Sequence, residues 1–589
     1  MHKLIGTAII ILASVSAIAA ESDPDETIIV TATRTEIPLT NATVPVTVIS
    51  REDIELSMAT DLAELLRFEA GIDIGRTGGP GQSTSIFMRG TESNHTLVLM
   101  DGVRINPGTI GGAAFQNIAP EIIERVEIVK GARSALYGTD AIGGVINIIT
   151  RRPQRTYAEA SAGGGSFNSR SGYFGGGTRT DNGEFSVTLD WNETDGFPAR
   201  TGSDIDRGYN NTSINLHAGR NFGSGKISVR HWSAFGTSEY LDFFLSPLDQ
   251  DYENSSTALD IQSVLGNSFT SKLIVSHVVD DITQNQDASF VESKRNSIDW
   301  QLSMTTEQHV LTGGLYYVDE DAGSFAFGSG FNEKTNVRAV FLQDQWSRDR
   351  HQTFVAVRLT DHETFGNETT WNAEYGFAIN EDWILQAGIG HAFRAPDATD
   401  RFGFGGNPEL APELADEIQF GIRFNPGGRH KIDLEFYQND IDDLIEFDLA
   451  TFELKNISSA EIRGAQLAWE YRGDSFSLRT NLVKQTADNA TDGTRLLRRA
   501  EESASVSVAK DIGEHRVGLT VLASGDRKDF GGVVLPGYVL ANLTGQIAIS
   551  ENWRLNARIE NLFDKTYETA SGFTMQERSG FVEVRYSWN

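Results

Sequence analysis

From Pro153 to the end of the chain, the sequence consists of short segments in which apolar and polar residues alternate, separated by Gly, Asn and Asp. In the last segment, FVEVRYSWN, the even-numbered residues from Val582 to Trp588 are apolar, and the residues between them are Glu583, Arg585 and Ser587. A period of two residues is typical of a β-strand, and helical periodicity is nearly absent here. The region is therefore predicted to form a large sheet with one apolar and one polar face.

A sheet of this kind can be a soluble sandwich or a membrane-spanning barrel, and three features favour the barrel. Residues 1–20 have the positive start, short apolar core and small residues of a secretory signal peptide, whereas an N-terminal anchor would need a longer core. Trp232 and Trp553 are expected at strand ends, where aromatic side chains mark membrane interfaces. At ~10 residues per strand, the length of the region allows a transmembrane β-barrel of about 22 antiparallel strands.

The composition of the chain excludes several kinds of site and partner. The 589 residues contain no Cys, which excludes disulfides, thiolate metal ligands and a cysteine nucleophile. No later segment is long and apolar enough for a membrane-spanning helix, so only a closed barrel could cross a bilayer. The net charge of -31, from 50 Lys and Arg against 81 Asp and Glu, argues against a nucleic-acid partner.

The sequence of residues 21–152 is typical of a small α+β domain. Ser50 and Asp53 are spaced as a capping box before a helix. A second helix is predicted with Thr60 as its N-cap, a shared apolar face that includes Leu62, and its end at Gly71. A barrel of about 22 strands has a wide lumen that leaks unless it is filled. We therefore predict three parts: a signal peptide (1–20), a plug domain inside the lumen (21–152) and the barrel (153–589).

The most specific motif is VEIVKGARSALYGTDAIGGVINIIT, from Val126 to Thr150. Together with IFMRG, LVLMDGVRIN, AFRAPDATDRFGFGGNPELAPE and NLFDKTYET, it resembles the TonB-dependent outer-membrane receptors over almost the whole mature chain. This resemblance implies a transporter in the outer membrane of a Gram-negative cell, surrounded by lipid and lipopolysaccharide, and not an enzyme. It also implies TonB with ExbB and ExbD as partners, and a periplasmic binding protein downstream.

In that family a strand near the mature N-terminus, the TonB box, pairs with TonB. The segment ETIIVTA suits such β-augmentation, because its β-branched residues favour the extended chain. The resemblance therefore assigns the TonB box to Glu26, Thr27, Ile28, Ile29, Val30, Thr31 and Ala32.

Within the family the chain resembles the cobalamin receptors, which makes a corrinoid the leading substrate. Two Gly-rich plug loops, Arg76 to Ser85 and Asn106 to Phe115, would face the ligand, with Gly111 at an exposed tip. The resemblance implies substrate contacts at Ser83, Ser85, Glu92, Ile110, Gly111, Ser289, Arg498 and Phe530. Arg89 and Arg133 are expected to pair with barrel carboxylates that hold the plug.

The cobalamin receptors order their outer loops around calcium, and acidic loops of this chain offer hard oxygen ligands. The candidate ligands are Asp204, Asp206, Asp242, Asp249 and Asp251, although Pro198 stands where a further aspartate is expected. A second departure is the C-terminal residue, which is Asn589 after Trp588 where such barrels end on an aromatic residue.

Two other cargoes and two other classes of protein are alternatives to a corrinoid receptor. The motifs FRAP and NPEL resemble those of haem receptors, but no His lies between them, and His391 lies just outside. A ferric siderophore is the other alternative cargo. A passive porin or adhesin would not need a plug, and an exported hydrolase would need a nucleophile, base and acid that do not stand out together.

Overall fold

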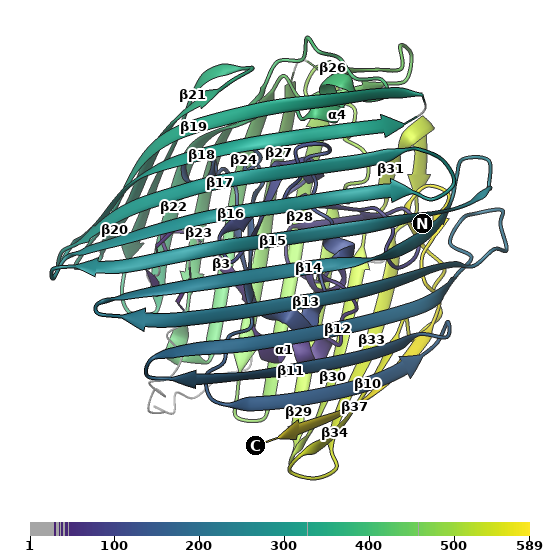
Figure 1. Ribbon diagram of the computed structural model, residues 1–589, viewed down its shortest axis with the longest axis horizontal. Coiled ribbons are helices and arrows are strands. Elements are labelled where there is room, and N and C mark those ends of the chain that lie inside the picture. The colour runs from purple at the N-terminus through teal and green to yellow at the C-terminus, as the bar shows by residue number, and fades with distance from the viewer. Residues whose placement is uncertain are drawn as a thin grey trace.

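In the computed structural model of the protein, 22 antiparallel strands of the described chain close into a barrel around an N-terminal α+β domain (Figure 1). The structure describes residues 29–30, 34–35, 37–38, 42–44, 46–326, 328–457 and 459–588. The predicted signal peptide and Asn589 lie outside these residues. The fold class expected from the sequence, a barrel of about 22 strands with a plug, is confirmed.

Each barrel strand pairs with the next one along the wall, and the last strand pairs with the first to close it. The strands are β10 (Tyr157–Gly165), β11 (Arg170–Thr180), β12 (Gly183–Phe197), β13 (Arg207–Phe222), β14 (Gly225–Leu241), β15 (Pro247–Leu265), β16 (Phe269–Gln284), β17 (Phe290–Thr305), β18 (His309–Ala326), β19 (Ser329–Arg348), β20 (His351–His362), β21 (Gly366–Ala378), β22 (Trp383–Arg394), β23 (Glu413–Phe424), β24 (His430–Asp442), β27 (Ser459–Arg472), β28 (Phe476–Asn489), β29 (Glu502–Ile512), β30 (His515–Ser524), β33 (Tyr538–Ala548), β34 (Trp553–Glu560) and β37 (Ser579–Trp588).

The two ends of the barrel differ in their connections. At one end the turns are tight, such as residues 181–182 between β11 and β12, whereas the other end carries long loops such as 395–412 and 490–501. The long loops contain α4 (Ala398–Phe402) and three small hairpins. Their strands are β25 (Ile445–Asp448), β26 (Glu453–Asn456), β31 (Arg527–Asp529), β32 (Val533–Leu535), β35 (Glu568–Ala570) and β36 (Phe573–Thr574). We call this end of the barrel the loop end.

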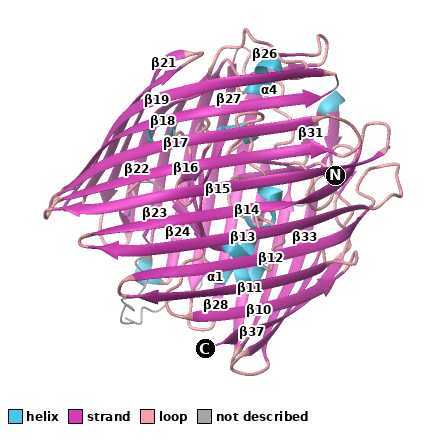
Figure 2. Cartoon of the chain, in the orientation of Figure 1, coloured by secondary structure: helices cyan, strands magenta, loops and turns pink. Residues whose placement is uncertain are grey.

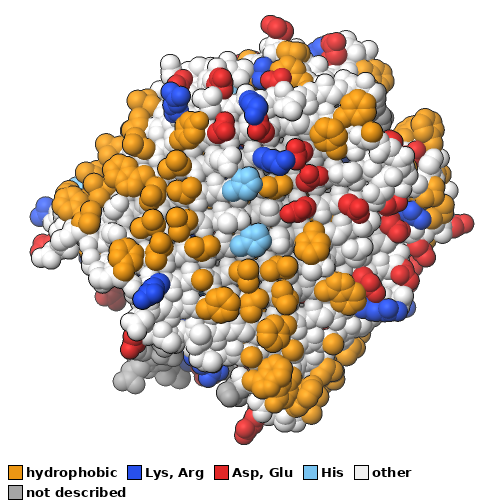
Figure 3. All heavy atoms as spheres, viewed as in Figure 1, with side chains coloured by type: hydrophobic (Ala, Val, Ile, Leu, Met, Phe, Trp, Pro, Cys, Tyr) orange, Lys and Arg blue, Asp and Glu red, His pale blue; other side chains and the backbone are white. Residues whose placement is uncertain are grey.

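The wall has an apolar outer face and a polar inner face. On β37, Val582 and Val584 are exposed while Glu583 and Arg585 are buried, as the alternation in the sequence predicts. Figure 3 shows hydrophobic side chains across much of one outer face, with acidic side chains gathered toward one edge. No helix of the described residues is long and apolar enough to span a membrane.

The domain inside the barrel is built on a five-stranded sheet with the order β3-β8-β9-β6-β7, in which β6 and β9 are parallel. Figure 2 shows its short helices enclosed by the barrel strands. Its elements are β3 (Val46–Ile49), α1 (Arg51–Ser57), α2 (Leu62–Leu66), β4 (Ile72–Arg76), β5 (Thr84–Met88), η2 (Ser93–His95), β6 (Thr96–Met100), β7 (Val103–Arg104), η3 (Phe115–Asn117), η4 (Pro120–Ile122), β8 (Ile123–Lys130), α3 (Ser134–Tyr137) and β9 (Gly144–Thr150). The division expected at residues 152–153 lies between β9 and β10.

Local signals in this domain were predicted with mixed success. The capping box of Ser50 and Asp53 is present at the start of α1. The N-cap of α2 is Asp61 and not Thr60, because the Asp61 carboxylate accepts from the Glu64 N–H at 2.9 Å. The helix ends at Leu66, before Gly71, whose φ of 70° belongs to the turn into β4.

The main apolar core lies in the plug and extends to the barrel wall. It is formed by residues of α1, α2 and the plug sheet, together with Trp232 and Ala234 of β14. Trp232 is only 4% exposed in the middle of its strand, so its expected place at a strand end is wrong. Trp553 does begin β34 and is exposed, as predicted.

Candidate functional site

The first predicted ligand loop, between β4 and β5, is fixed to the barrel from the inside. Gln82 Nε2 donates to the Glu239 carbonyl at 2.5 Å and to Ser238 Oγ at 3.1 Å, both on β14. Gly81 has a φ of 75°, and a Cβ there would overlap the Tyr209 ring. Ser83 is exposed beyond these anchors, and Ser85 is half-buried in β5. The loop therefore presents Ser83 to the lumen on a rigid base.

The second predicted loop, between β7 and η3, is held by a buried amide. Asn106 is fully buried; its Nδ2 donates to the Gly111 carbonyl at 2.8 Å, and its Oδ1 accepts from Val98 N at 2.7 Å. Ile110 is 48% exposed and forms the free tip of the loop.

Gly111 itself is buried, so its expected position at an exposed tip is wrong. A Cβ at this residue would lie 3.0 Å from Asn94 Cβ and 3.2 Å from Asp397 Oδ2. A side chain here would therefore enter the contact between the plug and the segment around α4. The family resemblance placed the two loops, but neither it nor the glycine pattern tells which residue of a turn faces outward.

Two of the predicted barrel residues lie together beside the first loop. The Arg498 guanidinium lies 5.3 Å from the centre of the Phe530 ring, and its Nε donates to Asp529 Oδ1 at 2.9 Å. Phe530 is 46% exposed. A Cβ on Gly75 would be 3.6 Å from Arg498 Cδ, which places this pair next to β4. The pair offers a cation and an aromatic face on a loop of the loop end.

The other two predicted contacts have different surroundings. Glu92 Oε1 lies 2.5 Å from Arg499 Nη2, so its charge is already paired with a buried arginine of the barrel. Ser289 follows the turn after β16, and four residues later Ser293 Oγ accepts from Gly108 N at 3.0 Å. Ser289 therefore lies on the segment that flanks the second loop. The sequence reasoning missed Arg499, although it stands beside Arg498 in the same RLLRRA motif.

A buried polar network, which the sequence analysis did not foresee, fixes the second loop to the wall. His95 Nε2 lies 3.0 Å from Glu413 Oε2, which also accepts from Arg394 Nη1 at 2.7 Å. Arg394 Nη2 in turn donates to Asp397 Oδ2 at 2.9 Å. The backbone N–H of Ala398 then donates to the Gly108 carbonyl at 3.1 Å. The FRAP motif, noted above for its resemblance to haem receptors, thus supplies the arginine at the centre of this network.

Arg89 and Arg133 pair with barrel carboxylates, as predicted. Arg89 Nη1 lies 3.0 Å from Glu417 Oε1, and its Nη2 lies 2.5 Å from Glu435 Oε2. Arg133 forms an ion pair with Glu374. All these side chains are buried, so the pairs join plug and barrel away from bulk water.

The predicted TonB box is only partly described. Ile29–Val30 forms β1 and pairs antiparallel with β2 (Ile37–Pro38), and the rest of Glu26 to Ala32 lies outside the described residues. Just after the box, Arg34 Nη1 lies 2.8 Å from Asp299 Oδ2 on β17, and its Nε donates to the Leu136 carbonyl at 2.5 Å. Sequence reasoning missed Arg34, which ends the quoted word DETIIVTATR.

The five candidate calcium ligands do not form a metal site as placed. Asp242 Oδ1 accepts from the N–H groups of Phe244 and Ser246 at 2.8 and 2.7 Å. Asp249 accepts from Asn285 and Gln286, Asp251 accepts from Thr237, and Asp204 and Asp206 are exposed. Among the described residues, no three His, Asp or Glu side chains are grouped to hold a metal. The calcium site stays a prediction, to be tested by calcium titration of the purified protein.

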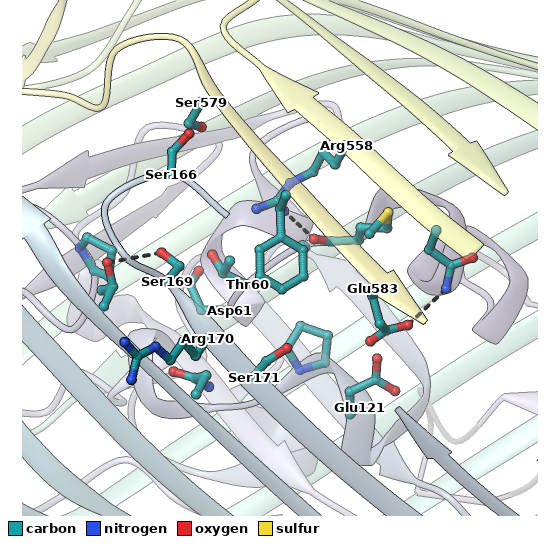
Figure 4. A pocket seen from close by; sticks show the side chains of 18 of the residues that line it. Thr60, Asp61, Glu121, Ser166, Ser169, Arg170, Ser171, Arg558, Ser579 and Glu583 are labelled. Atoms are coloured by element: carbon teal, nitrogen blue, oxygen red, sulfur yellow. Dashed lines mark hydrogen bonds between the residues drawn. The ribbon is translucent and has the colours of Figure 1, made fainter. Parts of the chain in front are cut away.

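A cavity of about 160 Å³ lies between the plug and the wall, near strands β10 and β37, whose pairing closes the barrel (Figure 4). Figure 4 shows Glu121 and Glu583 close together at one side and Arg170 at another. Asn556 Nδ2 donates to Glu583 at 2.9 Å. None of the eight predicted substrate contacts lines this cavity, although Pro80 of the first ligand loop does.

Comparisons with known proteins agree with this architecture. Residues 149–562 match the family described as TonB dependent receptor-like, beta-barrel, and residues 38–145 match the TonB-dependent Receptor Plug Domain. The chain is 29% identical over 596 residues to the vitamin B12 transporter BtuB of Photobacterium profundum, covering 97% of each chain. It is 30% identical to the vitamin B12 transporter BtuB of Vibrio vulnificus, covering 96% of each.

Solved structures show the same fold at lower identity. The siderophore receptor PirA from Acinetobacter baumannii matches with a TM-score of 0.80 and 18% identity, covering 94% of this chain and 99% of that one. The copper transporter OprC matches with a TM-score of 0.80 and 16% identity, covering 93% and 98%.

Proposed function

Because the chain belongs to the TonB-dependent receptor family of outer-membrane β-barrels, we propose that it imports a corrinoid, cobalamin, across the outer membrane. The observation that carries this choice of cargo is the match, over 97% of the chain, to a relative that is itself a vitamin B12 transporter. The likeness to siderophore and copper proteins is below 20% identity and supports the fold alone. Transport breaks no bond in the cargo, so we propose that the protein is not an enzyme.

The loop end offers the groups that a corrinoid needs. Such a ligand is a broad ring with an apolar body and many peripheral amides, which are recognised by aromatic faces and by scattered donors and acceptors. Exposed Ile110 and Phe530 supply apolar contact, and Ser83 and Arg498 supply polar contact. Ser85 is half-buried in β5, and the buried Gly111 follows Ile110 in the second loop. Ser289, in the connection between β16 and β17, is a further proposed contact.

Entry into the periplasm then requires the plug to move. A cavity of about 910 Å³ lies between the plug sheet and the wall from β11 to β17, and Arg34 and Asp299 both line it. TonB pairing with the box would pull on the chain just before Arg34 and strain its ion pair with Asp299. We propose that this step opens the cavity toward the loops, with ExbB and ExbD energising TonB. Lipid and lipopolysaccharide would surround the wall, and a periplasmic binding protein would accept the cargo.

Direct binding tests the choice of cargo. Purified receptor in detergent is titrated with cyanocobalamin, haem and a ferric siderophore, and we expect binding of cyanocobalamin alone. Arg498→Ala and Phe530→Ala should each weaken this binding about tenfold, since each removes one proposed contact at the loop end. Arg429→Ala is the matched control, because Arg429 is exposed on the tight-turn side, between β23 and β24. Binding of a siderophore or haem without cyanocobalamin would leave the family assignment intact and overturn the proposed cargo.

A further inference from the structure

A third cavity, of about 80 Å³, lies beneath the second plug loop and is lined by more arginines than acidic residues. The volume is several times the ~10–15 Å³ that one water needs. Plug residues of the loop and of the YGTD motif face strands β17 to β20 and the α4 segment across it. Its charged lining residues are Arg104, Arg295, Arg358, Arg394 and Arg401, with the acids Asp140, Glu320, Glu333 and Asp397.

Three of these arginines are neutralised locally. Arg104 forms an ion pair with Asp140, Arg295 lies 2.7 Å from Glu320, and Arg394 lies 2.9 Å from Asp397. The remaining acid, Glu333, makes no ion pair within the described residues. The other two arginines, Arg358 and Arg401, likewise have no carboxylate within ion-pair distance in this part of the chain.

Arg358 is the more informative of the two, because it is 1% exposed. Its Nε donates to Thr360 Oγ1 at 3.2 Å, and its guanidinium lies over the Tyr316 ring at 5.1 Å. Its buried Nη1 has no hydrogen-bond partner among the described residues. A buried cation without a counter-charge is costly, so a group that accepts from it would be stabilised strongly.

The neighbouring groups are donors as well. His362 Nδ1 accepts from the N–H groups of Thr364 and Phe365, at 3.2 and 3.4 Å, so its Nε2 carries the proton. The buried Nε of Arg401 also has no partner in the described structure. Gly138 closes the plug side of the cavity: with a φ of 90°, its missing Cβ would lie 3.3 Å from Arg358 Nη2.

We propose that this cavity binds a small oxyanion of the phosphate class, held by Arg358 and Arg401 with His362 as a neutral donor. A planar guanidinium matches two oxygens of such an anion, and the unpaired N–H groups supply the geometry. The oxyanion could be inorganic phosphate or the phosphodiester of the cargo. This second source rests on the proposed function, and the first does not.

Calorimetric titration of inorganic phosphate into the full-length receptor, in detergent and low-salt buffer free of corrinoid, tests the site. We expect saturable binding by the unmodified protein and at least ~10-fold weaker binding by Arg358→Met and by Arg401→Met. Arg338→Met is the matched control, since Arg338 is exposed on the outer face of neighbouring β19. It should bind phosphate normally.

Removing Arg358 takes away a buried charge that has no counter-ion, so the Arg358→Met variant should unfold at a temperature no lower than the parent. If the parent binds no phosphate, or if Arg358→Met binds it as tightly as the parent, the proposal is wrong. Competition between phosphate and corrinoids then shows whether the bound oxyanion is free phosphate or the phosphodiester of the cargo. Displacement of phosphate by cobalamin but not by cobinamide, which lacks the phosphodiester, places the cargo's phosphate in the cavity. Lack of displacement by either corrinoid makes free phosphate the ligand.

Discussion

At the residue scale, Arg89 shows what holds the plug in the lumen. Its guanidinium lies between Glu417 and Glu435 and is stacked 4.5 Å from the Tyr437 ring. Arg89→Met would leave two buried carboxylates without their cation, which typically costs about 3–5 kcal/mol. We expect a lower unfolding temperature in detergent. Arg463→Met, on the exposed face of β27, should change stability by less than about 0.5 kcal/mol. Equal effects of the two variants would contradict this role for Arg89.

Glu121 gives the contact between plug and wall a defined pH dependence. Burial alone would raise the pKa of Glu121, but Arg585, Arg51 and Arg151 together lower it from 4.5 to about 2. Because the folded pKa is the lower one, the stabilisation is complete above pH 4.5 and is lost as the pH falls toward 2. The unfolding temperatures of the parent and of Glu121→Gln should therefore differ at pH 7 and converge between pH 4.5 and pH 2. A constant difference over that range would argue against the prediction.

The sequence could identify Arg89 and Arg133 as plug residues that pair with the barrel, because both lie in motifs that resemble the plug of the family. It could not name their partners, which depend on the position of the plug relative to strands some 240 to 350 residues later. The same limit applies to Gly111 and Ile110. Their loop was predicted correctly, but which of them faces the lumen depends on the packing of Asn94 and Asp397 against it.

At the scale of elements, α2 shows how two adjacent signals compete. Thr60 and Asp61 are both favoured N-cap residues, so spacing alone cannot choose between them. Asp61 is also joined to Arg76 Nη2 at 2.7 Å, a contact with β4 that fixes its position. The alternating strands were easier to predict, because the period of two is imposed by a wall with lipid on one side and the plug on the other.

The TonB box is the element whose backbone matters most. Ile29 pairs with Pro38 in the structure, and pairing with TonB would likewise use the backbone N–H and C=O groups of this segment. Ile29→Pro removes one N–H and constrains the chain, so uptake of the cargo should be lost while binding at the cell surface is unchanged. Ile29→Val keeps the N–H and the β-branched side chain, and should transport normally. Normal uptake by Ile29→Pro would show that the coupling strand lies elsewhere.

At the scale of the whole molecule, the length of the alternating region predicted the number of strands. Their order in the barrel is their order in the chain, since each strand pairs with the next one. The presence of the plug also followed, because a barrel this wide needs its lumen filled. What could not be predicted is how tightly the two parts are joined. That depends on buried pairs such as Arg133 with Glu374 and His95 with Glu413.

The firm attachment of the plug to the barrel wall is what distinguishes a gated receptor from a passive porin. Buried charges and the apolar core, which reaches Trp232 on the wall, connect the plug to several sides of the barrel. The full-length protein in a planar bilayer should therefore be nearly silent. A variant without residues 46–150 should conduct in large, stable steps, because the polar inner wall would then enclose water. If the full-length protein conducts as freely as the variant, the plug does not close the lumen and the porin alternative is correct.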